Sequence, residues 1–262
     1  MSTPLRPAAA YLTRASITSS LIVELRRLTR SGLGLGVLMA FAFFGLSSPV
    51  LAIYMPEILG AAASTDQLAI SASQATPADA ISLFNQSAMQ LGLIVTVAVA
   101  ITSIGWDTRP GSSIFYRTRA RRLSTVLLPR LIVDWLIALA TYSCGLLLAV
   151  VVTASAIGHP PAGMVIRTWI ACGLYIVMAM SIGHLIAASL RRTTTAIALT
   201  TLLVLVLPVM NQVPGTSRWA PTALLLPAGL HAMPVVAALV VTGLCAVGSV
   251  LIARRQMLRR DA

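Results

Sequence analysis

Lysine is absent from this sequence, and charged residues of either sign are scarce. Without lysine the chain cannot build the G-x-x-x-x-G-K-[ST] loop that cradles nucleotide phosphates, so it is not itself a P-loop ATPase. Only 10% of the 262 residues are charged, whereas soluble domains average about 25%. Because 57% of the residues are apolar, a soluble fold could not bury them all, and we expect lipid to surround most of the chain.

Cysteine is also rare, and Cys144, Cys172 and Cys245 all lie within apolar stretches, where a lone thiol behaves as a small apolar side chain. Their spacing matches neither a zinc motif nor a disulfide framework. The formal charge of +12 could indicate a nucleic-acid partner. However, the arginines gather at the ends of apolar stretches rather than along one soluble face. We therefore expect no metal, no cofactor on this chain and no nucleic acid.

Six apolar stretches predict helices that cross a membrane. The predicted fold class is all-α: a polytopic membrane protein with a single transmembrane domain over residues 1–262. The six predicted spans cover residues 33–54, 83–105, 129–157, 164–190, 196–210 and 233–253. Glycines in the first span, among them Gly34, Gly36 and Gly45, leave room for a close helix neighbour.

Two further segments have their own patterns. In residues 8–30, Ile17, Leu21, Leu25 and Leu28 share one side of a helix, and the charged residues that include Glu24 and Arg27 lie outside that arc. This pattern predicts an amphipathic elbow helix in the lipid headgroups; the alternative is an ordinary basic flank before the first span.

The proline-rich segment Asn211–His231 is too short and too often interrupted to cross the membrane twice. It predicts a re-entrant outer segment between spans five and six.

The arginines give the predicted topology. With the amino terminus inside, all but Arg167 and Arg218 of the 19 arginines fall on the inner side. This distribution fits the positive-inside rule, so both termini are expected in the cytoplasm. Arg167, near the outer end of the fourth span, is expected to extend toward the outer headgroups. The arginine-only, alanine-rich composition suggests a GC-rich bacterial genome and hence a bacterial plasma (inner) membrane.

Few polar residues lie within the predicted spans. Asp134 is the one carboxylate well inside a span, and either a local ion pair with Arg130 or a partner on another helix would explain it. His184 lies one turn from Ser181, but no third group completes a catalytic set, so a packing histidine is expected and an enzyme is not. The candidate pore-lining residues are Asn85, Gln86, Gln90, Ser181 and His184.

The basic inner loop of residues 106–128 contains more arginine than topology requires, together with Phe115 and Tyr116. Apolar anchors surrounded by arginine are typical of a protein-docking surface, and a segment lying on anionic lipid is the alternative. Here the sequence resembles the type-2 permease family of ATP-binding-cassette (ABC) transporters. Asp107 matches an acidic position at the inner end of the second span, and Gly111-Ser112 matches a Gly-Thr-like pair. Thr118-Arg119 matches a Thr-Arg-Pro-like turn, although Ala120 replaces its proline, and Arg130 matches the basic residue that enters the third span.

The resemblance, which extends to the order of the six spans, the elbow and the re-entrant segment, implies a permease subunit. It implies a second permease chain, identical or similar, and separate cytoplasmic ATPase subunits that carry ATP and Mg. The family's cytoplasmic coupling helix would contact those subunits. The residues that the resemblance assigns to ATPase coupling are Asp107, Gly111, Ser112, Phe115, Tyr116, Arg119, Arg121 and Arg122. Export of an amphiphile, such as a lipid, peptide or drug, is expected by analogy with the family.

Other functions stay open from the sequence alone. A stand-alone secondary transporter would need an ionisable residue near the middle of the membrane, for which His184 is the candidate. A non-transporting assembly or immunity protein of the same fold cannot be separated from a permease by sequence.

Overall fold

The computed structural model describes residues 8–63, 75–104, 124–190, 192–213, 219–226 and 230–258. Every regular element within these ranges is a helix, and none is a strand. In chain order the elements are α1 (Ala8–Arg30), α2 (Leu33–Ala63), α3 (Pro77–Ser87), the π-helix η1 (Ala88–Gly92), α4 (Leu93–Ile104), α6 (Ser124–Ala156), α7 (Ala162–Ser189), α8 (Thr193–Val206), the 3-10 helices η3 (Leu207–Gln212) and η4 (Pro221–Leu225), and α9 (Ala232–Leu258).

Six of the described helical stretches are long and apolar enough to cross a membrane, as the sequence predicted. They lie at Leu33–Met55, Pro77–Ser103, Leu128–Ala156, Ala162–Ser189, Thr193–Gln212 and Ala232–Ala253. The second of them begins earlier than predicted, because Thr76 and Asp79 form a capping box at the start of α3. Together these helices define a multi-pass membrane protein.

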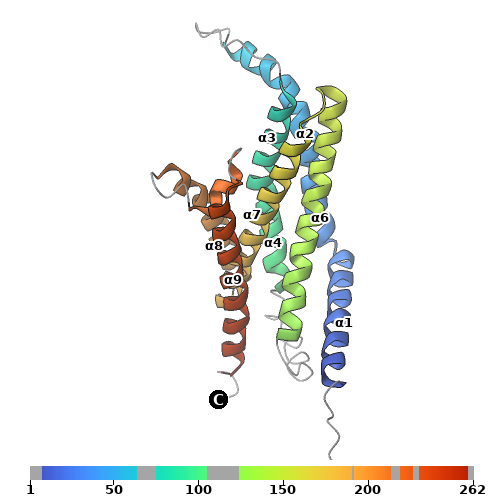
Figure 1. Cartoon of the computed structure of the whole chain (residues 1–262), viewed down its shortest axis with the longest axis vertical. Coiled ribbons are helices and arrows are strands. Elements are labelled where there is room, and N and C mark those ends of the chain that lie inside the picture. The colour runs from blue at the N-terminus through green and yellow to red at the C-terminus, as the bar shows by residue number, and fades with distance from the viewer. Residues whose placement is uncertain are drawn as a thin grey trace, which may run out of the picture.

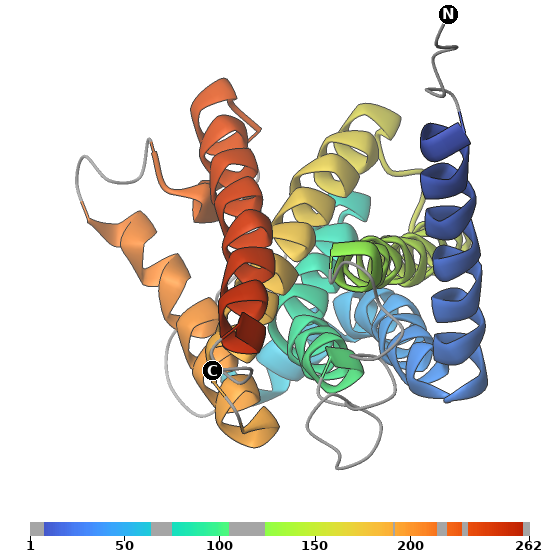
Figure 2. The same ribbon diagram turned by 90° about the horizontal axis from the view of Figure 1, so that it is seen from below.

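The helices form an elongated bundle in which α7 is the most enclosed element (Figure 1). Near the upper end in Figure 1, α3 and α7 begin, and toward the lower end α4 finishes and α6 starts. Seen from below, α1 lies on one flank beside α2 and α6, while α8 and α9 lie on the opposite flank (Figure 2). The main contacts join α2 with α6 and α7 with α9, so two packed helix pairs make up most of the bundle.

Small residues set the distance between α2 and α6. A Cβ placed on Gly145 would lie 2.7 Å from the Phe41 carbonyl oxygen, and one on Gly45 would overlap the Gly145 carbonyl. The two helix backbones are therefore in direct contact, as expected for a pair packed through glycine in a membrane. The prediction of a close neighbour holds for Gly45, whereas nothing lies within 4 Å of a Cβ at Gly36.

An aromatic cluster fills the space beside this contact. Tyr142 stacks on Phe84, with ring centroids 5.9 Å apart, and meets the edge of Phe41 at 5.7 Å. The Phe41 ring fits here because the facing position is Gly92, where a Cβ would lie only 2.8 Å from the ring. Gly92 ends the π-helical turn η1, so α3 and α4 form one long helix interrupted by a local widening.

The segment between α8 and α9 folds back on itself. Asn211 Nδ2 donates to the Thr222 carbonyl at 3.1 Å, and the Thr222 hydroxyl donates to Asn211 Oδ1 at 2.7 Å. These bonds join η3 to η4, and η4 packs against α7 and α9 with Thr222 and Leu224 buried. The pair of described helices η3 and η4, joined by these bonds, is called the hairpin below, and its re-entrant position in a bilayer stays a prediction.

Replacing Gly145 by leucine should destabilise the protein, because the side chain would force α2 away from α6. Overpacking of this kind costs about 1–3 kcal/mol or more. Gly36→Leu is the matched control, since it adds the same side chain to a position on α2 with open space. We expect a lower thermal midpoint in detergent for Gly145→Leu and a small change for Gly36→Leu. Equal midpoints for the two variants would contradict the close contact.

Candidate functional site

A cavity of about 1090 Å³ lies between the α3–η1–α4 helix, α7, α8 and the hairpin. Its volume is at the upper end of the range for ligand sites, which is about 300–1,000 Å³. The lining residues are Ser82, Asn85, Gln86, Met89, Gln90, Leu91, Ile94, Met164, Arg167, Thr168, Ala171, Cys172, Tyr175, Val204, Leu205, Pro208, Leu224, Leu225, Leu226, Leu230 and His231.

Three of the five candidate pore-lining residues line this cavity: Asn85, Gln86 and Gln90. Asn85 is held in place by the aromatic cluster, because the Tyr142 hydroxyl donates to its Oδ1 at 2.9 Å. With Oδ1 engaged in this way, the amide NH₂ of Asn85 is available as a donor on the lining. Gln90 lies in the π turn, a kind of helical distortion that is frequent at functional sites.

The other two candidates, Ser181 and His184, are not among the residues that line the cavity. Both are buried on α7, and the Ser181 hydroxyl donates to the Val177 carbonyl of its own helix at 2.7 Å. A role for either residue in lining a pore stays a prediction.

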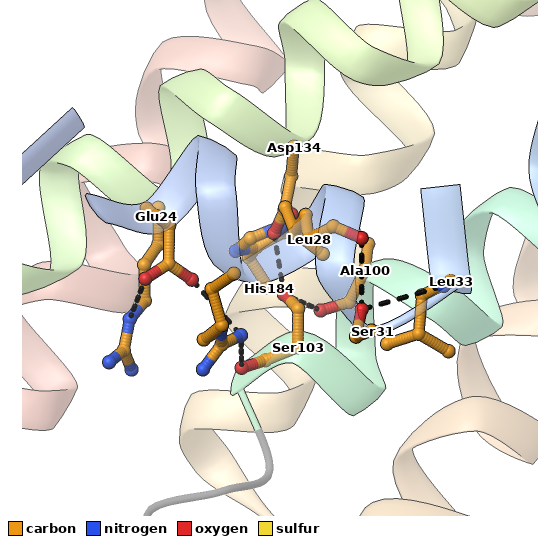
Figure 3. Close-up of polar contacts among 10 residues, drawn as sticks. Glu24, Leu28, Ser31, Leu33, Ala100, Ser103, Asp134 and His184 are labelled. Carbon is orange, nitrogen blue, oxygen red and sulfur yellow. Dashed lines mark hydrogen bonds and ion pairs between the residues drawn. The ribbon is translucent and has the colours of Figure 1, made fainter. Parts of the chain in front are cut away.

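His184 belongs instead to a buried polar cluster toward the lower end of the bundle (Figure 3). The Ser103 hydroxyl of α4 donates to Asp134 Oδ2 of α6 at 2.7 Å. His184 Nε2 of α7 lies 3.4 Å from the same oxygen, within ion-pair range but longer than a good hydrogen bond. Asp134 thus has partners on two other helices, which the sequence left open as the alternative to a local pair with Arg130.

The cluster continues onto α1. Glu24 is buried, its Oε1 lies 3.0 Å from Arg27 Nη2, and its Oε2 lies 3.6 Å from Arg130 Nε of α6. Arg27 Nη2 also donates to the Ser103 carbonyl at 2.8 Å. The amphipathic pattern directed the arginines of this helix toward anionic headgroups, whereas Arg27 contacts Glu24 and Ser103. Leu25, which belongs to the apolar arc, is 47% exposed.

The contacts of Glu24 and Arg27 have a physical reason. In a protein surrounded by lipid, exposed leucine costs nothing, whereas a charged group of α1 is stabilised by an opposite charge in the bundle. Arg130 of α6 is buried and provides that charge for Glu24. A helical wheel of α1 alone could not predict this orientation of Glu24, because it does not include the partner residue Arg130 of α6.

The structure adds Arg167 to the residues of interest. The sequence assigned Arg167 to the outer headgroups, but its side chain lines the cavity together with Cys172 and Tyr175 of the same helix. The spacing of these residues on α7 puts them on one helix face, so a helical wheel of α7 could have found the set. The helical wheel could not have shown that a cavity lies beside this face of α7.

The eight residues assigned to ATPase coupling, from Asp107 to Arg122, lie outside the described residues. Within the described ranges, no group of three or more histidine, cysteine, aspartate or glutamate side chains is placed to hold a metal ion.

Comparison of the chain with protein-family models finds no match, and neither does comparison with curated proteins.

Asp134→Ala should destabilise the protein strongly, because it removes the carboxylate that Ser103 and His184 face. Removing one member of a buried charged pair typically costs about 3–5 kcal/mol. Asp79→Ala, which removes the exposed N3 carboxylate of the α3 capping box, should cost about 0.5–2 kcal/mol and is the reference. Asp134→Asn, which keeps the shape of the carboxylate, should fall between the two. Unfolding by increasing SDS in mixed micelles measures all three, and an Asp134→Ala protein as stable as the original would refute the importance of this cluster.

Proposed function

We propose that this protein is the transmembrane permease subunit of an ABC transporter and exports an amphiphilic substrate. The observation that carries the proposal is the cavity of about 1090 Å³ between three of the six membrane-length helices. Several of the lining residues, among them Gln86, Gln90 and Arg167, are exposed, so a molecule from the surroundings can enter the space. A mixed polar and apolar lining suits a substrate that has both characters.

Energy for transport comes from separate ATPase subunits in this proposal. The support is the sequence of residues 106–128, in which Phe115 and Tyr116 stand among arginines, and the lack of a phosphate-binding loop on this chain. Closure of an ATP-bound ATPase dimer would press on the coupling helix that the resemblance implies within residues 106–128. That force would rock the six helices between inward and outward access.

The remaining parts of the proposal follow from the resemblance and the arginine distribution. A second permease chain completes the pore, both termini are cytoplasmic and the membrane is a bacterial inner membrane. The helix α1 would be the elbow at the inner surface, where its exposed arginines, Arg26 and Arg30, meet anionic headgroups. The hairpin at η3 and η4 would be the re-entrant outer segment.

Charge reversal in the inner loop tests the coupling. The double variant Arg119→Glu/Arg121→Glu should weaken stimulation of the partner ATPase by about tenfold or more, as expected when central residues of an interface are inverted. Arg191→Glu/Arg192→Glu is the matched control, because it makes the same charge change on the same predicted side, outside the loop. The measurement is substrate-stimulated ATP hydrolysis by the reconstituted complex. Stimulation and co-purification unchanged in the first variant would count against docking at this loop.

A second candidate function rests on the His184–Asp134 contact. Buried ionisable pairs between membrane helices are typical of proton relays in secondary transporters. The 3.4 Å separation of His184 Nε2 and Asp134 Oδ2 would suit a group that exchanges a proton during transport. In this alternative the chain works without an ATPase and is driven by the proton gradient.

Reconstitution of the purified chain alone separates the two functions. If the secondary-transport alternative holds, an imposed pH gradient drives substrate movement, and His184→Ala abolishes it because the exchanging group is lost. Under the permease proposal the isolated chain gives no gradient-driven movement, and ATP together with the ATPase subunits is required. Ser181→Ala, on the same helix, is the control for general damage to α7.

A further inference from the structure

The walls of the cavity change from polar to apolar along their length. On the α3–η1–α4 helix the lining begins with Ser82, Asn85 and Gln86 and ends with Ile94. On α7 the lining runs from Met164, Arg167 and Thr168 to Tyr175, which lies about 12 Å beyond Arg167 at 1.5 Å per residue. Both helices start near the upper end of the bundle, so the polar parts of the two walls lie at the same end (Figure 1).

The third wall continues the apolar part. It consists of Val204 and Leu205 of α8, Pro208 of η3, and leucines of η4 and the segment that follows it. Val204 and Leu224 are buried, and Tyr175 and Cys172 of α7 are buried as well. The deeper part of the cavity therefore offers aliphatic and aromatic surface to an alkyl chain.

The basic groups of the lining face no acidic group within it. Arg167 lies in the polar part, His231 follows the leucines of the third wall, and the described lining contains no carboxylate. Arg167 has no carboxylate of the described residues within 4.0 Å, the limit for an ion pair. Arg167 is itself exposed, so a charged group from outside can reach its guanidinium, and an anion is the charge that it attracts.

His231 directly precedes α9, and the Val235 amide bonds to its carbonyl at 3.3 Å. The first amides of this 27-residue helix therefore start at the edge of the cavity. Free amides and the helix dipole at such a terminus favour negative charge, in the same sense as the Arg167 guanidinium.

We propose that the cavity binds an amphiphile with an anionic headgroup, a phosphate or a carboxylate, placed against Arg167, with its alkyl chain along Tyr175, Val204 and Leu224. This inference rests on the proposed function, for which it names the substrate class. A guanidinium binds both headgroups through paired N–H donors, and the amides of Gln86 and Gln90 add further donors.

Displacement of a fluorescent ligand tests the proposal without any ATPase. The protein is placed in nanodiscs of phosphatidylcholine, and binding of a dansyl-labelled undecanoic acid is measured after subtraction of empty nanodiscs. The competitors share one chain length and differ in headgroup: dodecyl phosphate, dodecanoate, dodecanol and dodecyltrimethylammonium. We expect the two anions to displace the probe about tenfold better than dodecanol, and the cation to be the weakest.

Arg167→Gln should remove this preference and leave the affinity for dodecanol unchanged, because only the headgroup contact is lost. Arg192→Gln is the matched control, since Arg192 is exposed just beyond the end of α7 and outside the cavity.

Inorganic phosphate separates a lipid headgroup from a free anion. It should displace the probe poorly, and displacement as strong as that by dodecyl phosphate would overturn the requirement for an alkyl chain.

The outcomes also distinguish this inference from the proposed function. Equal displacement by anionic, neutral and cationic amphiphiles overturns the headgroup assignment and leaves an amphiphile-binding permease in place. An Arg167→Gln protein with the original anion preference overturns the role of Arg167. Failure of every amphiphile to bind overturns the cavity as a substrate site, and with it the main support for the proposed function.

Discussion

A carboxylate enclosed by apolar helices must be matched by polar groups from its neighbours, because the energy lost on leaving water is several kcal/mol per charge. Asp134 is the centre of that constraint in this protein. Its partners are drawn from α4 and α7, which fixes the rotation of both helices relative to α6. Ser103 also links this site to α1, because its carbonyl accepts a hydrogen bond from Arg27, and Arg27 is paired with Glu24. Helix α1 is thus attached to the bundle by charge rather than by apolar packing alone.

The upper half of the bundle is organised by different means. There the backbones of α2 and α6 touch at Gly45 and Gly145, and the Phe41–Tyr142–Phe84 cluster fills the space beside them. Tyr142 of this cluster holds Asn85 of α3 in place through its hydroxyl. Another side of the α3–η1–α4 helix faces the cavity. One end of the bundle is therefore secured by ion pairs, and the other by close packing beside an open space.

Much of this fold is predictable because lipid imposes simple rules. Long apolar stretches must be helices, and the six spans expected from the sequence match the six found within a few residues, apart from the early start of α3. The role of Asn85, Gln86 and Gln90 as lining residues follows from their shared face on one helix. Ser181 and His184 are equally polar and lie in a span, yet they pack inside, because composition cannot tell a wall of a cavity from a helix interface. The orientation of Glu24 depends on Arg130, more than 100 positions away in the chain, and no local pattern contains it.

The π turn at Ala88–Gly92 has a consequence for how this helix can change during evolution. Such a turn accommodates one residue more than an α-helical turn, so deletion of a single residue there would restore a regular α-helix. Everything on the amino-terminal side would then rotate by about 100° relative to α4, the angle of one residue in an α-helix. Asn85 and Gln86 would swing away from the cavity while Ser103 kept its place beside Asp134. A one-residue change in length at this point could thus exchange the chemistry of the binding wall without disturbing the ionic anchor below it.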